Sequence, residues 1–108
     1  MGISAQLDAA GVGIVHHFAG GVYAKETHIP AGVKLTQHIH SFDHLSSLAS
    51  GSVLLRAGGF VESLKGPAAI EIKAGVEHEV EALTDAIWFC IWPSDETDPD
   101  KIDAELIK

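Results

Sequence analysis

The sequence predicts an all-β fold, either a sandwich or a barrel. Short segments rich in β-branched and aromatic residues recur along the chain, and no stretch before residue 93 keeps a helical period. The pairs Gly20-Gly21 and Gly58-Gly59 are typical of tight hairpin turns, because glycine adopts positive φ without steric cost. Even spacing of the strands favours a closed or two-layered architecture. The predicted strands cover residues 12–18, 22–29, 33–39, 44–49, 52–56, 60–64, 68–72, 78–82 and 86–92.

A chain of 108 residues with 46% hydrophobic side chains is expected to form one domain, residues 1–108. Its core should span about residues 12–92, followed by an acidic C-terminal tail, residues 93–108. Within that tail, residues 101–108 are expected to form either a short helix or a solvated end. In a helix, Ile102 and Leu106, with Ile107 as a further candidate, would turn toward the barrel.

Charge and composition narrow the classes of partner. The formal net charge of −8 argues against binding to nucleic acid or to an anionic membrane surface. No apolar run approaches the roughly 20 residues needed to span a bilayer, and the N-terminus lacks a basic region followed by an apolar stretch. We therefore expect a cytoplasmic protein. Its single cysteine, Cys90, rules out an internal disulfide and is expected to be a buried thiol.

Seven histidines make the most informative pattern in the chain, and four of them are spaced as metal ligands. In a strand, residues two apart share a face, so His38 and His40 would present adjacent imidazoles. His44 would follow from the next strand, and His78 from a strand distant in sequence but adjacent in a closed barrel. These four residues predict a metal site, although unrelated surface or core histidines remain the alternative.

The spacing of histidines and glycines closely resembles the two motifs of the cupin superfamily. It reads Gly32-x5-His38-x-His40-x3-His44-x6-Gly51, then Gly66-x6-Lys73-x-Gly75-x2-His78. The resemblance covers residues 22–92 and implies a cupin-type double-stranded β-helix, that is, a jelly-roll barrel. It also implies one divalent transition metal (manganese, iron, copper, nickel or zinc) inside the barrel, and a homodimer. Within the superfamily, the chain looks similar to small single-domain cupins with four histidine ligands.

Several positions depart from the cupin pattern. His44 occupies the usual glutamate position, and a carboxylate from Asp43 is the alternative ligand there. In the second motif Lys73 replaces a proline, Ala82 replaces an asparagine, and the leading glycine is displaced by one residue. The second motif is therefore the weaker match.

The other histidines are expected to have ordinary roles. His16 and His17 are adjacent and would face opposite sides of a strand, so both cannot reach one ion. We expect a polar surface position for both. The same holds for His28, with a place at the barrel mouth as the alternative.

A fourth imidazole in place of a carboxylate would leave the metal its full charge and could leave positions open for substrate and oxygen or water. The leading hypothesis is a metal-dependent oxidoreductase, dioxygenase-like, that acts on a small organic molecule. A non-catalytic ligand-binding module and a metal-dependent lyase or isomerase are the alternatives, so catalysis itself is open. Residues considered for the pocket are Phe42, Arg56, Trp88, Cys90 and Trp92.

Strand alternation constrains these pocket candidates. Trp88, Cys90 and Trp92 share one face and Phe89 lies on the other, so only one group can line a cavity, and core packing is the alternative role. Glu77, Glu79 and Glu81 all face away from His78, which leaves no general base. Arg56 would bind an anionic substrate only if it pointed inward; a surface position is the other expectation.

Overall fold

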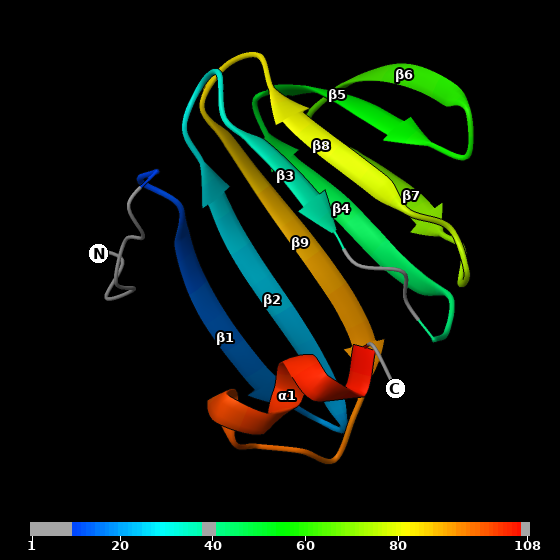
Figure 1. Cartoon of the computed structure of the whole chain (residues 1–108). Coiled ribbons are helices and arrows are strands. Elements are labelled where there is room, and N and C mark those ends of the chain that lie inside the picture. The colour runs from blue at the N-terminus through cyan, green and yellow to red at the C-terminus, as the bar shows by residue number, and fades with distance from the viewer. Residues whose placement is uncertain (1–9, 38–40, 107–108) are drawn as a thin grey trace.

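The computed structural model describes residues 10–37 and 41–106 of the chain. Within these ranges it is all-β apart from one short helix, and the strands form two antiparallel sheets that face each other as a jelly-roll sandwich (Figure 1). The elements are β1 (Gly13–Ala19), β2 (Val22–Ile29), β3 (Lys34–Gln37), β4 (His44–Ser50), β5 (Ser52–Ala57), β6 (Phe60–Lys65), β7 (Ala68–Ile72), β8 (His78–Ala82), β9 (Ala86–Pro93) and α1 (Pro99–Leu106). The fold class predicted from the sequence is confirmed.

The strand order separates neighbours in sequence and brings distant segments together. The first sheet has the order β1-β2-β9-β4-β7, and the second has the order β3-β8-β5-β6. All nine predicted strands are found, with ends that move by one residue at most places. The exception is β3, which starts at Lys34 rather than at Val33 and is described only to Gln37, so residues 38 and 39 of the predicted strand lie outside the described residues.

Alternation along β9 decides which aromatic side chains form the core. Trp88, Cys90 and Trp92 are buried between the sheets. Phe89 points to the outer face, where its ring stacks on that of His17 with the centroids 6.2 Å apart. A tryptophan side chain buries about 150–250 Å², which contributes roughly 4–6 kcal/mol of apolar transfer free energy. The two tryptophans are therefore the largest single contributors to this small core.

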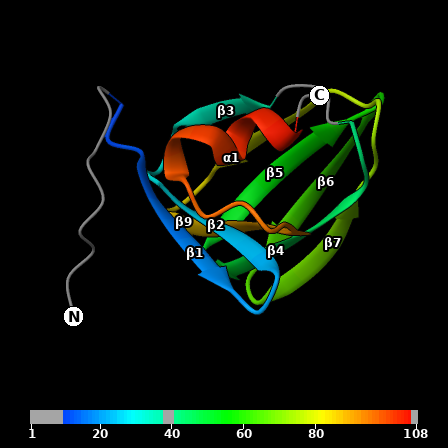
Figure 2. The same cartoon turned by 90° about the horizontal axis from the view of Figure 1, so that it is seen from below.

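Helix α1 lies across one end of the sandwich, between β3 and the pair β1 and β2 (Figure 2). Asp98 begins it as an N-cap, because its carboxylate accepts a hydrogen bond from the backbone N–H of Asp100 at 2.9 Å, and Pro99 takes the first helical position. Ile102 is fully buried in the core, which is the helical one of the two alternatives left open for the tail, while the side chain of Leu106 and residues 107–108 are outside the described part. No helix within the described ranges is long and apolar enough to cross a membrane.

Gly51, in the turn between β4 and β5, sits where no other residue fits. Its φ is +89°, and a Cβ built there would lie 2.3 Å from the carbonyl oxygen of Asp85. Only glycine allows both the left-handed backbone and this close approach. The turn therefore sets how β4 of the first sheet passes into β5 of the second sheet.

Candidate metal centre

Each sheet contributes one buried histidine to the space between the sheets. His44 begins β4 in the first sheet and pairs with Ile72, while His78 begins β8 in the second sheet and pairs with Ala57 and Gln37. The two residues are 4% and 1% exposed, and their ring centroids lie 6.4 Å apart with planes inclined by 44°. The fold thus brings together two predicted ligands that are far apart in the sequence.

The other two predicted ligands, His38 and His40, lie outside the described residues. Gln37, the last described residue before them, pairs with His78, and Ser41, the first described residue after them, shortly precedes His44. Asp43, the alternative ligand, is exposed, and its carboxylate accepts the backbone N–H of Ala74 at 2.7 Å. Asp43 therefore holds the loop before β8.

Polar contacts orient the two imidazoles. Ser46 Oγ lies 3.3 Å from Nε2 of His44 and donates to Sγ of Cys90 at 3.7 Å. His78 Nδ1 lies 3.4 Å from the carbonyl oxygen of Val76, and a proton on Nδ1 would leave the lone pair on Nε2. The rings of Trp92 and His44 pack in a T-shaped arrangement, with their centroids 6.2 Å apart and their planes inclined by 74°.

Burial keeps both imidazoles uncharged at neutral pH. It lowers the pKa of His44 from 6.5 to about 4, with a further lowering from the positive charge that His78 would carry and a partial opposition from Asp43. Burial also lowers the pKa of His78, against the hydrogen bond to the Val76 carbonyl. Because a metal binds the neutral imidazole, both rings offer lone pairs at pH 7 without having to lose a proton.

This donor chemistry fits a first-row transition ion. Neutral imidazole suits zinc, copper, iron and nickel, and a separation of 6.4 Å between ring centroids places both rings at the outer limit for sharing one ion. Among residues 10–37 and 41–106, no group of three or more His, Cys, Asp or Glu side chains is arranged to hold a metal. The described residues thus contain two of the four predicted ligands.

The pocket candidates occupy different surroundings. Trp88, Cys90 and Trp92 face the interior, and Phe42 is half-buried with its ring 6.0 Å from that of Trp92. Arg56 lies on the outer face of the second sheet, in register with Glu79.

Arg56 is held there by two carboxylates on β8. Its Nη1 lies 2.8 Å from Oε1 of Glu79 and 3.0 Å from Oε1 of Glu81. The hydrogen bonds and charges of Glu81 and Glu79 raise the pKa of the Arg56 guanidinium. Both glutamates face away from His78, as alternation predicts, but they bind Arg56 instead of standing free in solvent.

Two surface hollows reach the histidines from different sides. One of about 380 Å³ is lined by His44 and Trp92 together with apolar and acidic side chains of β2, β4, β7 and β9. The other, of about 450 Å³, is lined by His78 and by the turn that joins β5 to β6. Each hollow therefore borders one histidine of the buried pair.

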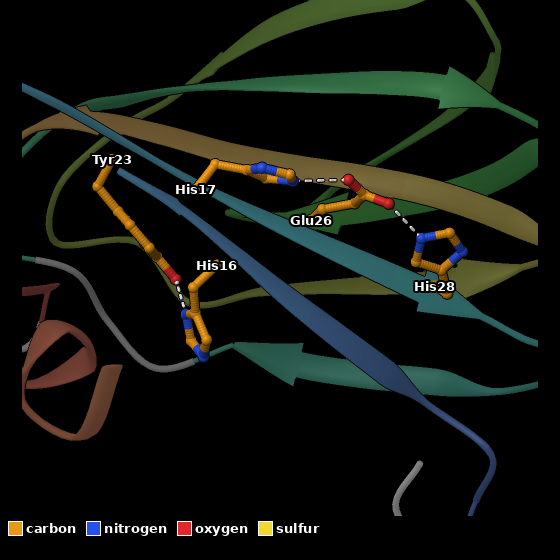
Figure 3. Close-up of polar contacts among 5 residues, drawn as sticks. All are labelled: His16, His17, Tyr23, Glu26 and His28. Atoms are coloured by element: carbon orange, nitrogen blue, oxygen red, sulfur yellow. Dashed lines mark hydrogen bonds and ion pairs between the residues drawn. The ribbon is translucent and has the colours of Figure 1, made fainter. Parts of the chain in front are cut away.

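Sequence reasoning missed the partners of the remaining histidines, which Figure 3 shows. The hydroxyl of the fully buried Tyr23 lies at hydrogen-bond distance, 2.6 Å, from Nδ1 of His16, and His16 is half-buried, so it lies only partly at the polar surface expected of it. On the outer face, Glu26 accepts from His17 at 2.8 Å and from His28 at 2.5 Å. The alternation of β2 places Tyr23 inward and Glu26 outward, but the pairing also requires the register of β1 against β2.

Comparison with solved structures identifies the fold. The chain superposes on the structure of KdgF from Halomonas sp. with a TM-score of 0.74 and 13% identity, covering 87% of this chain and 90% of that one. It superposes on an RmlC-like cupin from Shewanella frigidimarina with a TM-score of 0.70 and 17% identity, covering 86% and 87%.

A larger enzyme contains the same fold as one part of its chain. Salicylate 1,2-dioxygenase from Pseudoaminobacter salicylatoxidans, solved with gentisate, matches with a TM-score of 0.70 and 10% identity, over 81% of this chain but only 26% of the enzyme. No protein-family model matches the chain, and no curated protein matches it by sequence. At these identities the likeness concerns the fold, and it confirms the cupin-type jelly roll that the resemblance to the cupin motifs implied.

Proposed function

We propose that this protein is a metal-binding cupin that holds one divalent transition ion between its sheets and acts as a dioxygenase-like oxidoreductase on a small organic molecule. The proposed ligands are His38, His40, His44 and His78. The observation that carries the proposal is the pair His44 and His78, which face each other from opposite sheets, buried and uncharged.

The residues around the pair would prepare it for an ion. Ser46 and the Val76 carbonyl restrain the two rings, and supporting contacts of this kind raise the affinity of a metal site. The ring of Trp92 packs beside His44, and Phe42 packs against Trp92 in turn, so apolar surface adjoins the His44 imidazole. A bound ion would supply a Lewis acid or a redox centre to which substrate and oxygen could both bind.

Metal content tests the first half of the proposal. Untagged protein purified without added metal should contain close to one equivalent of manganese, iron, copper, nickel or zinc by elemental analysis. The content should fall sharply in His44→Ala and His78→Ala, and should stay at the wild-type level in His17→Ala, which removes an exposed imidazole from the outer face. Wild-type protein that takes up no metal even after reconstitution would refute the metal site.

Oxygen uptake tests the second half. The metal-loaded protein would be screened with small molecules that carry two neighbouring oxygen donors, including salicylate and gentisate, because a structure with the same fold is named for the one and was solved with the other. Uptake that His44→Ala abolishes is the expected result. Binding without turnover would favour a non-catalytic module, and turnover without oxygen consumption would favour a lyase or isomerase.

A further inference from the structure

We infer that substrate enters through the hollow beside His78, and that Phe60 selects a flat, uncharged ring there. The inference rests on the proposed function, since it takes His78 as the inner end of the site. It adds the route, a specificity-determining residue and the class of substrate.

Strand register places Phe60 on the same side of its sheet as His78. Phe60 pairs with Ala57 across β5 and β6, and Ala57 pairs with His78 across β5 and β8. Directly paired residues of antiparallel strands share a face, so the three form one row on the face that carries the buried histidine. Phe60, Ala57 and His78 also line the same hollow of about 450 Å³. Their neighbours Arg56, Val61 and Glu79, which belong to the opposite face, line it as well, so the hollow lies where the ends of these strands meet.

Burial changes abruptly along this row. His78 is 1% exposed, whereas Phe60 is 50% exposed, although both lie on the side of the sheet that faces the core. On the other flank of the histidines, the inward-facing Tyr23 and Trp92 are 0% and 2% exposed. The hollow on the Trp92 side is thus backed by fully buried aromatic side chains, whereas the hollow on the Phe60 side carries a half-exposed one. An aromatic side chain left half-exposed at such an opening gains most by stacking on a flat ligand.

The charges around the hollow are acidic. Its charged lining residues are Arg56, Glu77 and Glu79, and Arg56 is already bound by Glu79 and Glu81. Glu77 therefore leaves an excess negative charge at the rim. This rim opposes the entry of a carboxylate-bearing substrate and leaves an uncharged one unaffected. The class that fits is a phenol or diol with a planar ring.

Binding of two matched probes tests the inference. Catechol and salicylate share an aromatic ring with a hydroxyl group and differ in the neighbouring hydroxyl or carboxylate. Their dissociation constants would be measured by calorimetry at pH 7 without oxygen, on the protein as purified and after chelator treatment. Wild type should bind catechol more tightly than salicylate, and Phe60→Ala should weaken catechol binding by about three- to tenfold, the loss expected for one aromatic stacking contact.

The controls separate stacking from general damage to the fold. Phe60→Tyr keeps the ring and should bind catechol as wild type does, and Leu83→Ala, which removes a side chain of similar exposure (47%) in the turn after β8, should have no effect. Glu77→Gln should strengthen salicylate binding and leave catechol binding unchanged.

Three results would overturn the inference: an unchanged catechol constant in Phe60→Ala, tighter binding of salicylate than of catechol by wild type, or no binding of catechol at all. Elemental analysis of the same samples distinguishes failure of this inference from failure of the proposed function. Protein that lacks metal yet binds catechol in a Phe60-dependent way would keep this inference and reject the metal site.

Discussion

Acidification of the metal-free protein should lower its free energy of unfolding, because His44 is buried in its uncharged form. The pKa of His44 is 6.5 in the unfolded chain and about 4 in the folded protein, so as the pH falls the unfolded chain binds a proton at a higher pH than the folded protein does. Stability is therefore unaffected above about pH 7 and falls as the pH drops from 6.5 toward 4, because acid favours the unfolded chain. The loss from His44 alone is about 3 kcal/mol, since one pKa unit corresponds to about 1.4 kcal/mol. His78, whose pKa is also lowered, adds to it.

Urea unfolding at several pH values, followed by tryptophan fluorescence in the presence of a chelator, measures this loss. Carboxylates titrate as well, so the informative quantity is the difference between wild type and His44→Gln. The variant should lose about 3 kcal/mol less than wild type between pH 7 and pH 4, whatever its stability at pH 7. His78→Gln should also lessen the acid sensitivity, because the charge of His78 is one cause of the low pKa of His44. Parallel pH profiles for wild type and His44→Gln would refute the reasoning.

Three further predictions concern the surroundings of the site. Gly51→Ala should destabilise the protein by about 3 kcal/mol or more, because the added Cβ would lie 2.3 Å from a carbonyl oxygen. Gly20→Ala is the control: its φ is +59° but the space around it is open, so the free energy of unfolding should fall by only about 1–2 kcal/mol in the same urea titration. Ile102→Ala should lower the free energy of unfolding by about 2–4 kcal/mol and speed hydrogen exchange in α1, and unchanged exchange would contradict the docking of the helix through Ile102. Glu26→Gln should lower the free energy of unfolding by roughly 1 kcal/mol at pH 7. Hydrogen bonds from His28 and His17 lower the pKa of Glu26, so the difference in stability between wild type and variant should vanish as the pH falls below that pKa. A difference in stability that persisted in acid would contradict this role of the Glu26 carboxylate.

The fold was predictable because β-strand alternation and turn glycines are local features of a sequence. Each of the nine strands was predicted from a short segment between turn residues, and the alternation of side chains along a strand assigned Trp88, Cys90 and Trp92 correctly to one face. His44 and His78 were singled out by their spacing relative to glycines. Their burial and mutual approach needed the fold, because they lie on different sheets.

Contacts between strands could not be predicted, because they depend on register. Arg56 meets Glu79 and Glu81 only because β5 pairs with β8. His16 finds the Tyr23 hydroxyl only through the pairing of β1 with β2. The role of Phe60 was hidden for a related reason. Its segment has the composition of an ordinary strand, and what exposes the ring is its place on β6, at the edge of a sheet.

The charges inside and outside the proposed site are arranged in complementary ways. Inside, His44 and His78 are neutral at pH 7, so a divalent ion meets lone pairs without competing protons. Outside, Glu77 and the net charge of −8 favour the approach of cations and oppose that of anions. The acidic rim that selects against carboxylate substrates would therefore also raise the local concentration of metal ions. In this arrangement the ion would supply positive charge at the inner end of the hollow, where an uncharged phenol or diol could bind to it through its oxygen atoms.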